Sequence, residues 1–189
     1  MIKLYKHDNN DFLYAECWVD ANQVIIHKGK IGKKGHTEQL NLKDKLTSEE
    51  DIINSFKKKF ELEGYQKIPH DSVYLLVVQF PMKSIKGNKR DHWLKDKVIE
   101  YLDNELGWLG VGHIDGFDMG QQISFPTKYT LNIFCEVVDE SIGIAAIKRC
   151  LREYRLDYTH IKIASKLYFS DNKFELKYSA KKQDQTFSL

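Results

Sequence analysis

Apolar and polar residues alternate over short stretches early in the chain, and this period-two pattern is typical of strands with one buried face. Three such segments lie at residues 13–19, 24–27 and 37–42. Glycines separate the second segment from the third, so we expect the backbone to turn sharply between them. The pattern predicts a small antiparallel sheet.

A helix is predicted after this sheet, because apolar residues there recur at helical spacing. Thr47 and Glu50 form a Thr-x-x-Glu capping box, in which Thr47 caps the helix and the Glu50 side chain reaches back to it. The residues expected to face the sheet are Ile52, Ile53, Phe56 and Phe60.

The best domain boundary is at Pro69, after which a strongly apolar strand over residues 73–80 begins a new pattern and Pro81 closes it. Further elements are predicted as helices at 91–106 and 140–154 and as strands at 129–138, 159–169 and 174–178. This alternation predicts a ferredoxin-like sandwich, with two helices packed on one face of an antiparallel sheet.

The chain is therefore expected to be an α+β protein with two small domains. Residues 1–69 would form the first, an antiparallel sheet plus one helix, and residues 70–180 the ferredoxin-like second. Residues 181–189 are polar and are expected to form a frayed tail.

Residues 107–120 are rich in glycine and are expected to form a connection between a helix and a strand. A dinucleotide-binding loop has the opposite order, strand before helix, so the segment is not expected to cradle a phosphate. His113, Asp115 and Asp118 would be the residues of a metal or acid–base site here, but their spacing is not diagnostic of one. Helix capping by Gly107 and a close-packed turn explain the glycines more simply.

Composition limits the possible functions. The chain has 189 residues and a formal net charge of +2, so any surface that binds nucleic acid must be local. The N-terminus lacks the apolar core of a signal peptide and no apolar run is long enough to span a bilayer, so we expect a cytoplasmic protein without membrane contact. The three scattered cysteines are expected to be reduced thiols packed in the cores, and no cofactor or metal is expected.

The most informative segment is a glycine-rich basic turn at residues 26–38, which holds no carboxylate until Glu38. Lysines on such a turn would present a concentrated positive field to an anion such as a phosphate. A solvated hairpin tip is the simpler alternative, because basic surface turns are common. The residues of the predicted binding surface are Lys28, Lys30, Lys33, Lys34 and His36.

The first part of the chain resembles the WGR domain, a module found beside the catalytic part of poly(ADP-ribose) polymerases. The resemblance covers about the first 68 residues and depends on an early strand at 14–19, the Gly-basic-Ile-Gly-x-x-Gly pattern at 29–35, and a helix at 49–60 followed by Gly64 and Tyr65. It implies the WGR fold and a surface that meets DNA ends and neighbouring domains.

The signature itself departs from the family. This chain has Lys28-Gly29-Lys30 where the family has Trp-Gly-Arg. Lysine keeps the positive charge of arginine but has neither its planar, forked donor set nor a stacking face. The resemblance therefore implies contact with DNA ends for Lys30 and Lys28 alone.

Three functions remain possible on the sequence. The leading expectation is a non-enzymatic binding protein that contacts nucleic-acid phosphates, DNA rather than RNA, through the basic turn. The second is an adaptor that docks on an acidic protein partner. The third is a hydrolase or metal enzyme built on His113, Asp115 and Asp118; no nucleophile–base pattern and no resemblance to a polymerase catalytic domain supports an enzyme.

Overall fold

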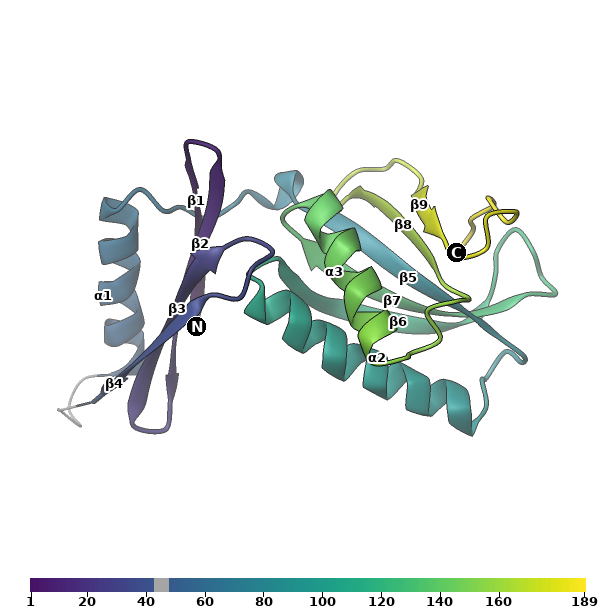
Figure 1. Cartoon of the computed structure of the whole chain (residues 1–189), viewed down its shortest axis with the longest axis horizontal. Coiled ribbons are helices and arrows are strands. Elements are labelled where there is room, and N and C mark those ends of the chain that lie inside the picture. Colours follow the sequence, from purple (N-terminus) through teal and green to yellow (C-terminus); the bar gives the residue numbers. More distant parts are fainter. Residues whose placement is uncertain (43–47) are drawn as a thin grey trace. The chain divides into compact units, whose positions relative to one another are not determined.

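The computed structural model describes residues 1–42 and 48–189, and its helices and strands form two compact units (Figure 1). The first unit comprises Met1–Pro69 and Trp108–Gly110, and the second comprises His70–Gly107 and Val111–Leu189. Each unit contains one antiparallel sheet, and α-helices complete the fold. The predicted α+β class is confirmed.

The first unit is built on a four-stranded antiparallel sheet in the order β1-β2-β3-β4. Its strands are β1 (Ile2–Asp8), β2 (Asp11–Asp20), β3 (Gln23–Lys30) and β4 (His36–Asn41). The first of these is absent from the predicted strands, because only Ile2 and Leu4 of β1 are buried and the rest of the strand is largely polar.

One face of this sheet is covered by α1 (Glu49–Leu62). Ile52 and Phe60 of the helix join a buried apolar cluster with residues of β1, β2 and β3, as the helical spacing predicts. The helix is capped by Ser48, whose hydroxyl accepts a hydrogen bond from the Asp51 N–H at 3.1 Å. The expected capping residue Thr47 lies outside the described residues, and the cap at Ser48 shifts the start of the helix by one residue.

The second unit begins with a short 3-10 turn and contains a five-stranded sheet and two helices. Its elements are η1 (His70–Ser72), β5 (Tyr74–Met82), α2 (Lys89–Trp108), β6 (Gly112–Gln121), β7 (Tyr129–Val137), α3 (Glu140–Glu153), β8 (Lys162–Leu167) and β9 (Glu175–Ser179).

The strand order β6-β7-β5-β8-β9 places β7 between β5 and β6, and β5 between β7 and β8. Each helix therefore connects two parallel strands that have a third strand between them, which is the split β-α-β arrangement of ferredoxin-like folds. The two helices lie side by side on one face of the sheet (Figure 1), where Tyr101 of α2 stacks on Tyr154, directly after α3, with ring centroids 4.0 Å apart. The other face carries no helix among the described residues.

Two segments of the second unit differ from expectation. β5 continues through Pro81, which is tolerated because pairing with β8 stops at Gln79 and the proline has a strand neighbour only in β7. The glycine-rich segment is a strand, β6, and not a connection. A register shift between Ile114 and Gly116 bends it, and pairing with β7 supplies the hydrogen bonds that the weak strand propensity of glycine does not predict.

The C-terminal residues make hydrogen bonds to the sheet and its neighbouring loop, whereas the sequence predicts a frayed tail. The Gln79 side chain donates to the Ser188 carbonyl at 2.8 Å, and the Ile123 N–H donates to the Leu189 carbonyl at 2.7 Å. Lys162 reaches the Thr186 carbonyl at 2.6 Å. Backbone carbonyls of the tail thus satisfy donors that the sheet presents.

All three cysteines are free and buried, as predicted. Burial raises the pKa of the Cys17 thiol to about 11 and that of Cys150 to about 12. The pKa of Cys135 rises for the same reason. These thiols are packing residues, because both protonation and burial keep them unreactive at neutral pH.

Candidate nucleic-acid interface

The basic turn between β3 and β4 packs around the buried side chain of Tyr14, which lies on β2 directly opposite Gly29. A Cβ at Gly35 would overlap the Tyr14 hydroxyl. It would also lie 2.5 Å from the Lys28 carbonyl oxygen and 2.6 Å from His27 Nε2. A Cβ at Gly29 would lie 2.8 Å from the Gly35 Cα atom. These glycines are required by close packing, and their spacing is no sign of a phosphate cradle.

A network of buried polar side chains of β2 and β3 packs against the turn. Glu16 Oε1 lies 2.6 Å from His27 Nδ1, and His27 Nε2 lies 3.0 Å from the Tyr14 hydroxyl. That hydroxyl donates to the Trp108 carbonyl at 3.2 Å. Burial raises the pKa of the Tyr14 phenol far above its ordinary value, and the Glu16 carboxylate adds to the effect. The phenol therefore stays protonated and acts as a fixed donor.

The backbone of the turn is also held on its inner side. The Ile31 N–H donates to the Phe12 carbonyl at 2.8 Å, and the Gly32 N–H donates to the Leu109 carbonyl at 2.9 Å. Gly32 has a φ of 80°, which favours glycine at this position. With its backbone anchored, the turn leaves Lys33 and Lys34 as exposed side chains.

Three of the five predicted site residues share the face of the sheet that α1 covers. Lys28 is paired with His36 in the register of β3 and β4, and Lys30 lies two residues along the same strand, so all three side chains point to this face. The Lys28 ammonium group lies 5.2 Å from the centroid of the Phe60 ring. Lys30 forms an ion pair with Asp11.

The other two residues, Lys33 and Lys34, have a different environment. Both are exposed at the turn, and neither forms an ion pair with any residue that the structure describes. Within the predicted set, these are the two exposed lysines that no ion pair with a described residue neutralises.

The register of the sheet adds residues that the sequence reasoning missed. Lys6 of β1 and Lys30 of β3 both lie opposite Leu13 of β2, which puts the two lysines on the same face. Lys6 lies 3.8 Å from Asp8. Neither Lys6 nor the carboxylate of Asp11 is part of the local glycine–lysine pattern, so only the strand pairing identifies them.

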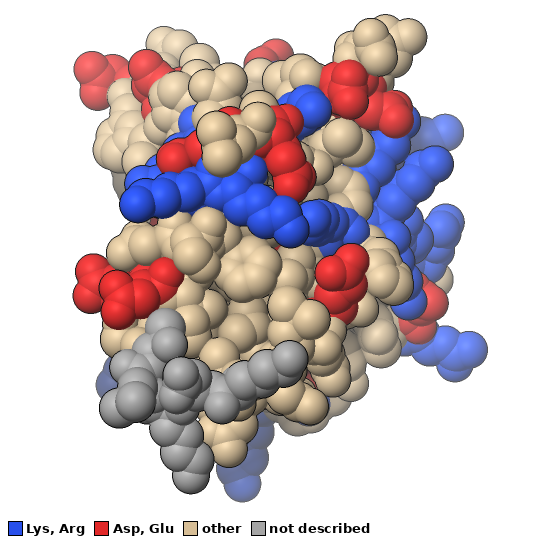
Figure 2. Space-filling model, turned by 90° about the vertical axis from the view of Figure 1, so that its left-hand side faces the viewer, with Lys and Arg blue, Asp and Glu red and all other residues tan. Residues whose placement is uncertain are grey.

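Figure 2 looks onto the side of the molecule that carries α1, where basic side chains form a row across the face. Carboxylates lie on both sides of this row. On α1 itself, Lys57 lies 3.8 Å from Glu61, while Lys58 and Lys59 are exposed. The face is a basic row bordered by acidic groups, and not a uniformly positive surface.

The residues of the possible metal or acid–base site are not brought together as one. Asp115 accepts a hydrogen bond from the Tyr168 hydroxyl at 3.1 Å, and Asp118 accepts one from the Asn132 side chain at 2.7 Å. His113 is exposed on β6. Over residues 1–42 and 48–189, no group of three or more His, Cys, Asp or Glu side chains is placed to hold a metal ion.

None of the helices in the described part of the chain has the length and apolarity needed to cross a membrane. Comparison with protein-family models, with curated proteins and with solved structures finds no match to this chain.

Proposed function

We propose that this protein is a non-enzymatic binding protein whose first unit contacts nucleic-acid phosphates through the basic turn. The observation that carries the proposal is the exposure of Lys33 and Lys34 without an ion pair to any described residue. The resemblance of the same segment to a WGR domain supports the same function, with DNA as the expected nucleic acid.

The local charge balance supports phosphate binding. The ammonium groups of the turn and of the strand end before it belong to Lys28, Lys30, Lys33 and Lys34. The carboxylates that the sheet places beside them belong to Asp11 and Glu38. Because the cations outnumber the carboxylates, the region attracts anions although the whole chain has a net charge of only +2.

The paired lysines remain available to a ligand. The side chains of Lys30 and Asp11 are 42% and 50% exposed, and ion pairs of that kind contribute only about 0–1 kcal/mol. A phosphate can therefore replace Asp11 at small cost. Lys28 is held over the Phe60 ring, which fixes its position without neutralising it.

The test is the affinity for a labelled DNA duplex, measured by fluorescence anisotropy at about 50 mM and about 200 mM salt, a range over which phosphate contacts weaken steeply. Three to five such contacts predict a slope of log K against log salt between about −3 and −4.5. The double substitution Lys33→Glu and Lys34→Glu should remove binding.

The matched control is the double substitution Arg152→Glu and Lys173→Glu in the second unit, which makes the same change in charge at exposed side chains. It should leave the affinity for the duplex unchanged. Absence of duplex binding at the lower salt concentration, or an equal loss in the control variant, would end the proposal.

The edge of the first sheet favours a second candidate, an adaptor that binds an acidic protein segment. β4 pairs with β3 on one side and with no other strand among the described residues. An unpaired edge can accept an added strand from a partner, and Lys33 and Lys34 at its start would favour an acidic one. Pulldown with and without nuclease separates the two functions, because only a protein partner of the adaptor survives nuclease.

A further inference from the structure

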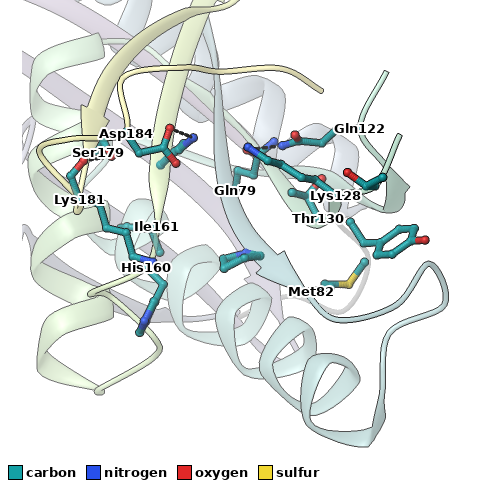
Figure 3. A pocket seen from close by; sticks show the side chains of 14 residues that line it. Gln79, Met82, Gln122, Lys128, Thr130, His160, Ile161, Ser179, Lys181 and Asp184 are labelled. Carbon is teal, nitrogen blue, oxygen red and sulfur yellow. Dashed lines mark hydrogen bonds and ion pairs between the residues drawn. The ribbon is translucent and has the colours of Figure 1, made fainter. Parts of the chain in front are cut away.

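The second unit contains a pocket of about 300 Å³ at the end of its sheet (Figure 3). The pocket lies where β5 ends and where β7 and β8 begin, and the C-terminal residues close one side of it. In Figure 3, His160, Lys181 and Asp184 lie on one side, Gln122, Lys128 and Thr130 on the other, and Gln79 lies between them. All of these residues belong to the second unit, so the pocket is independent of the basic turn.

The floor of the pocket is polar and buried. Gln79 donates to the Asn132 side chain at 2.9 Å and to the Ser188 carbonyl at 2.8 Å, and it accepts from Gln122 Nε2 at 3.1 Å. Its amide group is therefore fully used and rigidly held. The buried polar groups are arranged by the fold before any ligand enters.

Two groups at this floor keep free hydrogen-bonding capacity. Thr130 is only 5% exposed and Gln122 only 6% exposed. The Thr130 hydroxyl and the Gln122 side-chain carbonyl have no hydrogen-bond partner among the residues that the structure describes. No buried side-chain nitrogen or oxygen atom among the described residues lacks a hydrogen-bond partner, so these two groups open into the pocket, where a ligand hydroxyl can replace the water that they meet.

The walls of the pocket carry a positive charge. Among the described residues that line it, the cations are Lys128, Lys162 and Lys181, and the one carboxylate is Asp184. Lys162 is already engaged, because it lies 2.8 Å from Asp184 and donates to the Thr186 carbonyl. The bond from Lys162 holds the pKa of Asp184 below its ordinary value, so this carboxylate stays ionised and paired.

Lys128 and Lys181 are then the ammonium groups available to a ligand. No ion pair joins either of them to another residue in the described part of the chain, and Lys128 lies 4.6 Å from the centroid of the Phe125 ring. Pro81, Met82 and Ile161 add apolar contact. The pocket thus offers cations at its rim and accessible donor and acceptor groups at its floor.

We propose that this pocket binds a small phosphorylated molecule that carries hydroxyl groups and has about the size of a sugar phosphate. The phosphate would contact Lys128 and Lys181, since an ammonium group binds phosphate as a point charge. A ligand hydroxyl would donate to the Gln122 carbonyl and accept from Thr130. This binding is a further activity, separate from the nucleic-acid contact of the first unit.

The test is isothermal titration calorimetry of the full chain with ribose 5-phosphate, ribose, inorganic phosphate and gluconate, each up to about 10 mM, a concentration that detects even weak binding. Ribose 5-phosphate should bind, and inorganic phosphate should compete with it. Ribose alone should not bind. Binding of gluconate but not of ribose 5-phosphate would overturn the assignment of a phosphate, and no binding of either would overturn the site.

Variants tie the binding to the pocket. The double substitution Lys128→Glu and Lys181→Glu should weaken the affinity for ribose 5-phosphate by about tenfold or more, because it reverses the charge of both proposed phosphate contacts. Thr130→Val, which keeps the shape of the side chain, should weaken it by about threefold to tenfold.

The double substitution Arg152→Glu and Lys173→Glu is again the control for charge. Its affinity for ribose 5-phosphate should equal that of the parent chain. An equal loss in this control would overturn the proposal. The duplex affinity of Lys128→Glu with Lys181→Glu should be unchanged, so a failure of this site is distinguishable from a failure of the nucleic-acid function.

Discussion

Gly35 lies against the Tyr14 hydroxyl so closely that a Cβ at position 35 would overlap this oxygen. The tyrosine is fully buried, and the glycine belongs to the turn that presents Lys33 and Lys34. The contact between Gly35 and Tyr14 therefore links the packing of the first unit to the position of its exposed lysines.

Gly35→Ala should destabilise the first unit by about 1–3 kcal/mol, the usual cost of adding a methyl group where there is no space. The nearby Lys28 carbonyl, 2.5 Å from the added carbon, is backbone and cannot move alone. Urea denaturation followed by circular dichroism measures the change.

Gly107→Ala is the matched control, because a Cβ there meets nothing within 4 Å outside its own helix. It lies in α2, where alanine is favoured over glycine by about 0.5–1 kcal/mol, so this variant should be as stable as the parent or more so. Equal stability of Gly35→Ala and the parent would contradict the packing argument.

The hydroxyl of Tyr14 should itself contribute to stability. Tyr14→Phe removes a group that lies 3.0 Å from His27 Nε2 and donates to the Trp108 carbonyl at 3.2 Å. Leaving these buried partners unsatisfied should cost about 1–3 kcal/mol of unfolding free energy. Tyr154→Phe, at a half-exposed ring, should cost less than about 0.5 kcal/mol. Equal effects of the two substitutions would show that the hydroxyl of Tyr14 carries no special role.

Helices and strands with a clear apolar periodicity were predictable from the sequence. Strands that depend on pairing with a neighbouring strand were not. α1 and the strands near residues 73–80 and 129–138 follow from apolar spacing alone. β6 could not be predicted, because Gly112, Gly116 and Gly120 weaken any strand signal and only the pairing with β7 fixes the segment.

The same distinction applies to the candidate sites. The lysines of the turn are adjacent in sequence and could be listed, whereas the ion pair of Lys30 with Asp11 depends on the strand register. The pocket of the second unit has no linear motif at all, because its lining residues come from segments as far apart as Gln79 and Asp184. Sequence patterns identify local sites, and folding assembles the others.

The stability of the chain should fall in alkaline solution because its thiols are buried. At pH values below the ordinary thiol pKa of 9.0, both the folded and the unfolded state keep the proton and the stabilisation is fully present. Above it, unfolded thiols ionise while folded Cys17 keeps its proton up to about pH 11. Stability is therefore lost as the pH rises through this window, by at most about 1.4 kcal/mol per pH unit for each thiol.

Urea denaturation with a reductant present, at about pH 8 and about pH 10, measures this loss on either side of the ordinary thiol pKa. The triple substitution Cys17→Ala, Cys135→Ala and Cys150→Ala removes the three groups and should reduce the pH dependence. An unchanged pH dependence in the triple variant would assign the alkaline loss to other groups, such as the buried phenol of Tyr14.

The C-terminal residues should stabilise the second unit through their backbone. A chain that ends at Gln185 loses the carbonyl of Ser188, which accepts from Gln79, and the carbonyl of Leu189, which accepts from the Ile123 N–H. It also loses the contact of the Phe187 ring with Phe174, whose centroids are 6.1 Å apart. The buried Gln79 amide is then left with an unsatisfied hydrogen, so we expect a loss of about 1–3 kcal/mol in the unfolding free energy.

The control for this truncation is Gln185→Ala, which changes an exposed side chain directly before the cut and should alter stability by less than about 0.5 kcal/mol. The shortened chain keeps Lys181 and Asp184 but loses the carbonyl that fixes Gln79, so the floor of the pocket should loosen while its cations remain. Ribose 5-phosphate should then bind more weakly than to the parent chain. A shortened chain as stable as the parent would contradict this prediction. It would mean that the hydrogen bonds to these carbonyls add no more to the free energy of unfolding than hydrogen bonds to water do.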